Sequence, residues 1–266
     1  MGKDKVMSKT IAVAGKGGTG KTTVAALLIQ HLIEHNSGTI LAIDADPSTN
    51  LHLVLGVPLE ETIGDIREES LQEIARGGLE GISKHDYLEL RINQALVESA
   101  KFDLLAMGRP EGPGCYCAAN YILRLCIDRL AKSYDYVVID NEAGLEHLSR
   151  RTTRDVDLLL IVSDPTMRGL IAASRIVDLI KELDTHVSHI RLVLNRVSRD
   201  GDSRPTLAPQ LEGLIRENGL ELAGLIPEDS TVADYDALGK PLVDLPKESP
   251  IRSAVEDLLQ ALDGLL

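Results

Sequence analysis

Short apolar runs alternate with longer stretches of mixed apolar and polar residues along this chain. The short runs have the length and the Leu, Ile and Val content of buried strands, and the stretches between them, such as 23–33 and 210–217, carry helical spacing. Strands alternating with helices indicate an α/β fold with a doubly wound, mostly parallel sheet flanked by helices. The predicted strands lie near residues 10–15, 39–45, 101–107, 135–140, 157–163, 190–196 and 221–226.

The length of the chain favours one domain. With 266 residues, of which 44% are hydrophobic, it is long enough for one complete α/β domain and short for two. We therefore expect residues 1–266 to form a single domain. Residues 58–100 contain acid-rich helical pieces, including 63–76, and predict a helical insertion that is available to a partner subunit or a client protein.

Residues 15–23 match the phosphate-loop pattern G-x-x-x-x-G-K-[ST] between a predicted strand and a predicted amphipathic helix at 23–33. The glycines allow a tight turn whose backbone N–H groups point at an anion, and the helix adds its positive N-terminal end. Lys21 is expected to reach the β- and γ-phosphates of ATP or ADP, and the Thr22 hydroxyl to bind Mg²⁺. The loop residues predicted to contact the nucleotide are Gly15, Lys16, Gly17, Gly18, Thr19, Gly20, Lys21, Thr22 and Thr23.

Two of the predicted strands end in acidic residues. Asp140 follows four apolar residues, a pattern typical of the carboxylate that holds a Mg²⁺-bound water in phosphoryl-transfer sites. Asp44 and Asp46 stand at the end of the strand near 39–45. Either acid alone is also common where a strand meets solvent. Together with the phosphate loop they predict a site for a magnesium nucleotide.

Cys115 and Cys117 lie two positions apart in a loop rich in Pro and Gly. Side chains at this spacing point to the same side of an extended chain, and a disulfide between them would be strained. Two thiolates form half of a tetrahedral or square-planar site for Zn²⁺ or Ni²⁺, which a symmetric dimer would complete. The loop follows the strand near 101–107, so we expect the thiolates on the face that binds nucleotide. The alternative is two incidental small residues.

Composition limits which binding partners and which cellular compartment we expect for this protein. A net charge of -13 disfavours nucleic acid and anionic membranes as partners. Residues 1–9 lack a signal-peptide apolar region, and no apolar stretch is long enough to span a bilayer. Three cysteines do not make a disulfide framework, so we expect a cytoplasmic protein with free or metal-bound thiols. Residues 253–266 contain no Lys or Arg, and we expect this helix to pack on the domain.

Lys16, directly after Gly15, makes the loop resemble that of the deviant P-loop ATPases, a group that includes septum-positioning and partition ATPases and the nitrogenase iron protein. The resemblance implies a homodimer in which Lys16 reaches the partner's phosphates, much as an arginine finger does. With Lys21 and Asp46 it forms the predicted catalytic set. The other implied roles are orientation of the attacking water by Asp46, support of that strand end by Asp44, a backbone contact to the γ-phosphate by Gly144, contact with the base edge by Asn195, and closure over the base by the loop containing Pro227.

The segments 113–120, Pro-Gly-Cys-Tyr-Cys-Ala-Ala-Asn, and 140–147, Asp-Asn-Glu-Ala-Gly-Leu-Glu-His, resemble the CooC-type carbon monoxide dehydrogenase maturation ATPases. The resemblance covers nearly the whole chain. It implies nickel held at a dimer interface and ATP hydrolysis tied to nickel delivery into carbon monoxide dehydrogenase or acetyl-CoA synthase. Two alternatives remain: an iron-sulfur scaffold or electron donor whose dimer holds a [4Fe–4S] cluster, and a metal-free nucleotide switch that recruits a protein partner.

Overall fold

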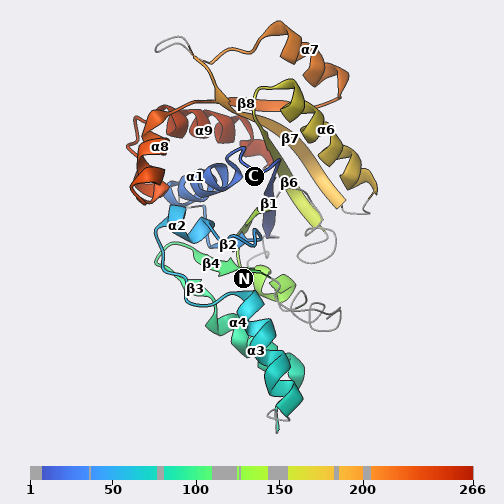
Figure 1. Ribbon diagram of the computed structural model, residues 1–266, viewed down its shortest axis with the longest axis vertical. Helices are drawn as coiled ribbons and strands as arrows, with labels where there is room; N and C mark the ends of the chain where they lie inside the picture. The colour runs from blue at the N-terminus through green and yellow to red at the C-terminus, as the bar shows by residue number, and fades with distance from the viewer. Residues whose placement is uncertain are drawn as a thin grey trace, which may run out of the picture.

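A computed structural model of the chain describes residues 8–35, 37–76, 81–109, 125, 127–142, 155–182, 186–199 and 205–265. It contains an eight-stranded sheet in the order β3-β4-β2-β5-β1-β6-β7-β8 (Figure 1). All neighbouring strands pair in parallel except β3 and β4. The predicted α/β fold with a mostly parallel sheet is therefore confirmed. The strands are β1 (Lys9–Ala14), β2 (Ile40–Asp44), β3 (Val97–Glu98), β4 (Asp103–Ala106), β5 (Tyr136–Asp140), β6 (Asp155–Ser163), β7 (His186–Val197) and β8 (Leu222–Pro227).

Each of the predicted strands corresponds to a strand of the sheet, and only β3 has no counterpart among them. β3 has two residues and pairs antiparallel with β4 at the edge of the sheet. A strand of two residues is too short to show a periodic pattern, so the sequence contains no signal for it. The same edge carries the helical pair α3 and α4, which Figure 1 shows extending away from the sheet.

Helices cover both faces of the sheet, and each face has its own apolar core (Figure 1). In β1, Ile11 and Val13 face α1 and α9, whereas Ala12 and Ala14 face the core shared with α3, α4, α6 and α7. This alternation follows from the two-residue period of a strand. The helical elements are α1 (Lys21–Glu34), α2 (Leu51–Leu55), α3 (Ile63–Arg76), α4 (Lys84–Gln94), α6 (Met167–Glu182), α7 (Pro209–Glu217), α8 (Ser230–Ala237), η2 (Leu242–Asp244), α9 (Pro250–Ala261) and η3 (Asp263–Leu265).

The first helix, α1, is buried on most of its surface. The prediction of an amphipathic helix at 23–33 was right about the helix and wrong about its exposure, because every residue from Val24 to Gln30 is buried. The sheet covers one side of α1, and α2, η2 and α9 cover much of the rest. The polar side chain of Gln30 is tolerated there because its amide donates a 2.7 Å hydrogen bond to the Val243 carbonyl.

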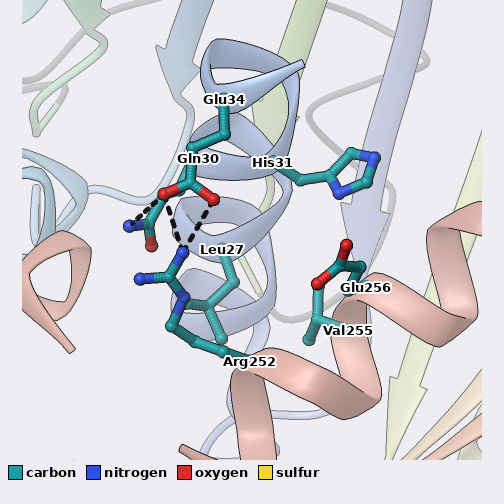
Figure 2. Close-up of a pocket in the computed structure, with 7 residues that line it drawn as sticks. All are labelled: Leu27, Gln30, His31, Glu34, Arg252, Val255 and Glu256. Carbon is teal, nitrogen blue, oxygen red and sulfur yellow. Dashed lines mark hydrogen bonds and ion pairs between the residues drawn. The ribbon is translucent and has the colours of Figure 1, made fainter. Parts of the chain in front are cut away.

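The C-terminal helix α9 packs against β8 and α1, as expected for the tail of the chain. Its apolar face buries Ile251, Val255, Leu258 and Leu259. At the edge of this contact, the Arg252 guanidinium donates two 2.7 Å hydrogen bonds to the Glu34 carboxylate of α1 (Figure 2). The hollow between these helices has a volume of about 20 Å³, which is room for about one water and no ligand.

The predicted helix at 63–76 coincides with α3, and a second helix, α4, packs beside it. Ile66 of α3 and Leu88 and Ile92 of α4 are buried against the sheet. Ser83 caps α4 by accepting a hydrogen bond from the Asp86 N–H. Within the parts of the chain that the structure describes, none of the helices has the length and apolar character needed to cross a bilayer.

Candidate nucleotide-binding site

The phosphate loop joins the end of β1 at Ala14 to the start of α1 at Lys21, in the predicted context. Two glycines are required by their surroundings. A Cβ atom at Gly15 would lie 2.1 Å from the Val162 carbonyl oxygen of the neighbouring strand β6. Gly20 has a φ of 92°, and a Cβ atom there would lie 2.3 Å from Nδ2 of Asn195. The loop thus passes close to both β6 and β7.

Inside the loop, the carbonyl oxygen of Lys16 accepts hydrogen bonds from the Thr19 hydroxyl at 2.9 Å and from the Lys21 ammonium at 3.4 Å. Lys21 is buried and lies over its own loop, which places a positive charge where phosphates are expected. The Lys16 side chain, in contrast, belongs to an exposed residue at the rim. This exposure is what the predicted reach into a partner subunit requires, and that reach stays a prediction.

Asp44 and Asp140 stand side by side where β2 and β5 end. Both are buried, with 0% and 1% of their surfaces exposed. Asp44 accepts hydrogen bonds from the N–H groups of Asp46 at 3.1 Å and Leu51 at 2.9 Å. It therefore links the strand end to the following turn and to α2, in agreement with the predicted supporting role.

Asp140 differs because neither of its carboxylate oxygens has a hydrogen-bond partner of good geometry among the described residues. Burial raises its pKa to about 7, the charge of Asp44 acts in the same direction, and the nearby Thr22 hydroxyl and Lys21 ammonium oppose the shift. Burial also raises the pKa of Asp44 to about 6, against the two backbone N–H groups that it accepts. A buried, unpartnered carboxylate is costly unless a cation or a proton neutralises it.

This geometry fits a magnesium ion. Mg²⁺ prefers oxygen ligands and is bound in nucleotide sites by one or two carboxylates together with phosphates and waters. Asp140 provides two oxygens that lack a partner of good geometry, in the vicinity of Thr22 and Lys21. Asp46 lies two residues beyond Asp44, and its charge acts on Asp140. One of its oxygens accepts the Ser48 N–H at 2.8 Å, so Asp46 stands at the site within a tight turn.

A cleft of about 610 Å³ opens beside the start of α1. It is lined by Thr22 and Thr23 of the loop and by the predicted base contacts Asn195 and Pro227. The Asn195 amide already donates to the Thr19 carbonyl at 2.8 Å and accepts the Arg196 N–H at 2.9 Å. One N–H and one oxygen lone pair remain on that amide, which are the donor and acceptor that an adenine edge can pair with.

Several residues that line this cleft carry no signal in the sequence. Arg196 is a charged residue that directly follows Asn195, yet no motif marks it. Leu53 and Val54 of α2 and Val232 of α8 provide apolar walls. These three occupy ordinary helical positions, so only the folded arrangement shows that they share a cleft.

Part of the predicted site lies outside the described residues, namely Cys115, Cys117 and Gly144. The described residues contain no group of three or more His, Cys, Asp or Glu side chains arranged for a metal ion. The chain that leads toward the cysteines leaves β4 beside Asp44, because the Met107 N–H donates to the Asp44 carbonyl at 2.8 Å. The start of that segment is therefore at the same sheet edge as the carboxylates.

Comparison with known proteins identifies a nucleotide-binding family. Residues 10–242 match the family described as the CobQ/CobB/MinD/ParA nucleotide binding domain. An uncharacterized ATP-binding protein of Methanocaldococcus jannaschii is 45% identical, with 95% of this chain and 97% of the relative covered. The carbon monoxide dehydrogenase accessory protein CooC of Rhodospirillum rubrum is 34% identical, with 88% of this chain and 89% of the relative covered.

Among solved structures, the septum site-determining protein MinD of Pyrococcus horikoshii, complexed with Mg-ADP, superposes with a TM-score of 0.68. The two sequences are 25% identical, and 97% of each chain is covered. The MinD protein of Bacillus subtilis is 27% identical over 89% of this chain and 82% of its own length. The chain therefore belongs to the CobQ/CobB/MinD/ParA nucleotide-binding family of P-loop ATPases.

Proposed function

We propose that this protein is a homodimeric ATPase that holds nickel, or zinc, between the Cys115 and Cys117 thiolates of its two subunits. ATP binding and hydrolysis would be coupled to delivery of the nickel to a client enzyme, carbon monoxide dehydrogenase or acetyl-CoA synthase. The observation that carries the ATPase part is Asp140, a buried carboxylate with two unpartnered oxygens near Lys21 and Thr22. The metal part rests on the two cysteines and on the 34% identity with CooC.

In this proposal each residue of the loop and the strand ends has a separate task. Lys21 binds the β- and γ-phosphates, and Thr22 and Asp140 hold Mg²⁺. When bound, the ion would neutralise negative charge on the phosphates. Asp46 orients the attacking water, and the exposed Lys16 reaches the phosphates of the opposite subunit. Asn195 and Pro227 face the base.

The nucleotide and the thiolates act on each other through the dimer. Nucleotide binding draws the two subunits together and completes a site of four thiolates, and metal binding must favour the closed dimer in return, because coupling between sites is reciprocal. The Met107 hydrogen bond to the Asp44 carbonyl supports this coupling, since it ties the start of the cysteine-bearing segment to the end of β2, two residues before Asp46. Hydrolysis would open the dimer and release nickel to the client.

The test is an anaerobic titration of Ni²⁺ and Zn²⁺ into reduced protein, with ADP or ATP and without nucleotide, while light scattering reports the mass. Wild type is compared with Cys115→Ser/Cys117→Ser, and Cys126→Ser is the matched control for loss of a thiol. We expect one metal ion per dimer, loss of tight binding in the double variant only, and an affinity that changes with nucleotide.

Other outcomes would contradict the metal-delivery proposal and point elsewhere. Brown protein with thiolate-to-iron absorption bands, bound through the same cysteines, would identify an iron-sulfur scaffold. Cysteine-independent metal binding, with dimerisation and ATPase activity unchanged in the double variant, would identify a metal-free nucleotide switch.

A further inference from the structure

Two consecutive residues near the end of β7, Asn195 and Arg196, both contact the phosphate loop. In a regular strand, neighbouring side chains point to opposite faces of the sheet. Here the pairing of β7 with β8 shifts register between Leu194 and Val197, and Arg196 has a φ of 58°. A bulge with a residue in the left-handed region re-aims side chains, and such bulges are common beside active sites.

The two side chains hold two consecutive carbonyl groups of the loop. Nη1 of Arg196 donates to the Gly18 carbonyl at 3.0 Å, and Nδ2 of Asn195 donates to the Thr19 carbonyl at 2.8 Å. The Arg196 N–H in turn donates to the Asn195 side-chain oxygen at 2.9 Å, so the pair is linked. In each case a side chain of β7 fixes the direction of one peptide group of the loop.

The direction of these peptide groups matters for phosphate binding. A planar trans peptide points its C=O and its N–H in opposite directions. When the Gly18 and Thr19 carbonyls face β7, the N–H groups of Thr19 and Gly20 point away from β7. Backbone N–H groups aimed into the loop are what binds a phosphate there. The Thr19 N–H makes only a long contact of 3.4 Å with the Lys16 carbonyl, so it stays accessible to a stronger acceptor.

We propose that Arg196 is a positioning residue of the nucleotide site, which orients the Gly18–Thr19 peptide for phosphate binding. This inference rests on the nucleotide binding proposed above. Arg196 also lines the cleft beside Thr22 and Pro227, so its remaining guanidinium N–H groups are available to the nucleotide. The left-handed backbone of Arg196 is disfavoured for any residue with a Cβ atom, and here it accompanies the bond from the guanidinium to the Gly18 carbonyl.

The strained backbone separates a positioning role from a purely structural one. Arg196→Gly removes the guanidinium and relieves the backbone strain, so the thermal midpoint should stay unchanged or rise. Arg196→Ala removes the guanidinium and keeps the strain. If Arg196 positions the loop, both variants should bind Mg-ADP about tenfold more weakly, the loss expected for one charge-assisted hydrogen bond. KM for ATP should rise by a similar factor with kcat changed by less than about threefold, since the contact exists before and during the reaction.

The experiment measures Mg-ADP binding by calorimetry, ATPase kinetics, and hydrogen exchange of the loop amides in the full chain. Arg216→Ala, which removes an exposed arginine from α7, controls for the change in net charge. We expect weaker binding and faster exchange at Thr19 and Gly20 in both Arg196 variants, and wild-type behaviour in the control. If wild type binds Mg-ADP and both Arg196→Gly and Arg196→Ala bind it with unchanged affinity, the inference is overturned. It is also overturned if the weaker binding of Arg196→Gly comes with a lowered thermal midpoint. Failure of the wild type to bind Mg-ADP would instead refute the proposed function.

Discussion

Replacing Asp140 with asparagine should make the protein more stable and inactive at the same time. In the protein free of nucleotide and Mg²⁺, burial raises the pKa of Asp140 to about 7 from an ordinary 3.8. The folded state therefore holds a proton that the unfolded state has lost between these two pH values. The contribution of this group to stability consequently falls as the pH rises from about 3.8 to about 7 and stays low above that.

The size of the effect follows from the gap between the two pKa values. A pKa of about 7 against 3.8 corresponds to about 4 kcal/mol of lost stability at about pH 8, and about 1 kcal/mol at about pH 4.5. Asp140→Asn removes this cost. A buried amide without a partner costs about 1 to 3 kcal/mol at every pH. The difference between the two pH values, about 3 kcal/mol in favour of the variant at the higher pH, is therefore independent of how well the amide is accommodated.

The assay is urea unfolding in the presence of a chelator, at both pH values, for wild type and Asp140→Asn. Asp178→Asn is the matched control, because it removes the same charge from a side chain on α6 that is 64% exposed. Mg²⁺-dependent ATP hydrolysis should be lost in Asp140→Asn and kept in the control. If the stability change in Asp140→Asn were the same at both pH values, ionising Asp140 would cost the fold nothing and the raised pKa would be excluded.

Three further predictions concern the scaffold of the site. Gly15→Ala should lower the free energy of unfolding by about 2 kcal/mol or more and abolish Mg-ADP binding, because the new Cβ atom would overlap a backbone oxygen of β6. Thermal melting measures the loss of stability, and calorimetry measures the loss of binding. Arg252→Ala should cost about 1 to 2 kcal/mol in urea unfolding, since it removes both hydrogen bonds to Glu34 and the one to the Leu245 carbonyl; an unchanged value would contradict a stabilising role of these bonds. Burial and the charge of His35 lower the pKa of His31, so the folded state binds fewer protons there than the unfolded state, and stability should fall as the pH drops below about 6.5. In thermal melts across that range, His31→Gln should lose less stability with falling pH than wild type. An equal loss in the two proteins would exclude His31 as the source.

The sheet and the phosphate loop could be predicted because their signals are local. Buried parallel strands read as apolar runs, and the loop motif needs a strand before it and a helix after it. The exposure of α1 could not be predicted, because α9 and η2, more than 200 residues away in the sequence, provide its cover. The pair of carboxylates, Asp44 and Asp140, could be predicted only in part. Both strand ends were identified, whereas their adjacency depends on β2 and β5 pairing in register.

The contribution of β7 to the site shows the same limit. Asn195 was identified by its order along the chain and does line the cleft, but its bond to Thr19 was not foreseen. Arg196 had no signal, because its reach depends on a shift in strand register and a left-handed backbone that no sequence motif encodes. The roles assigned to Cys115 and Cys117 remain predictions from their spacing and from the resemblance that they carry.

Anaerobic native mass spectrometry of the reduced full chain, with Ni²⁺ and a non-hydrolysable ATP analogue, can show whether one dimer binds both nucleotide and nickel. We expect a wild-type dimer that carries two nucleotides and one nickel ion, and a Cys115→Ser/Cys117→Ser dimer that carries both nucleotides and no nickel. Nickel bound to monomers, or bound equally by the double variant, would contradict it.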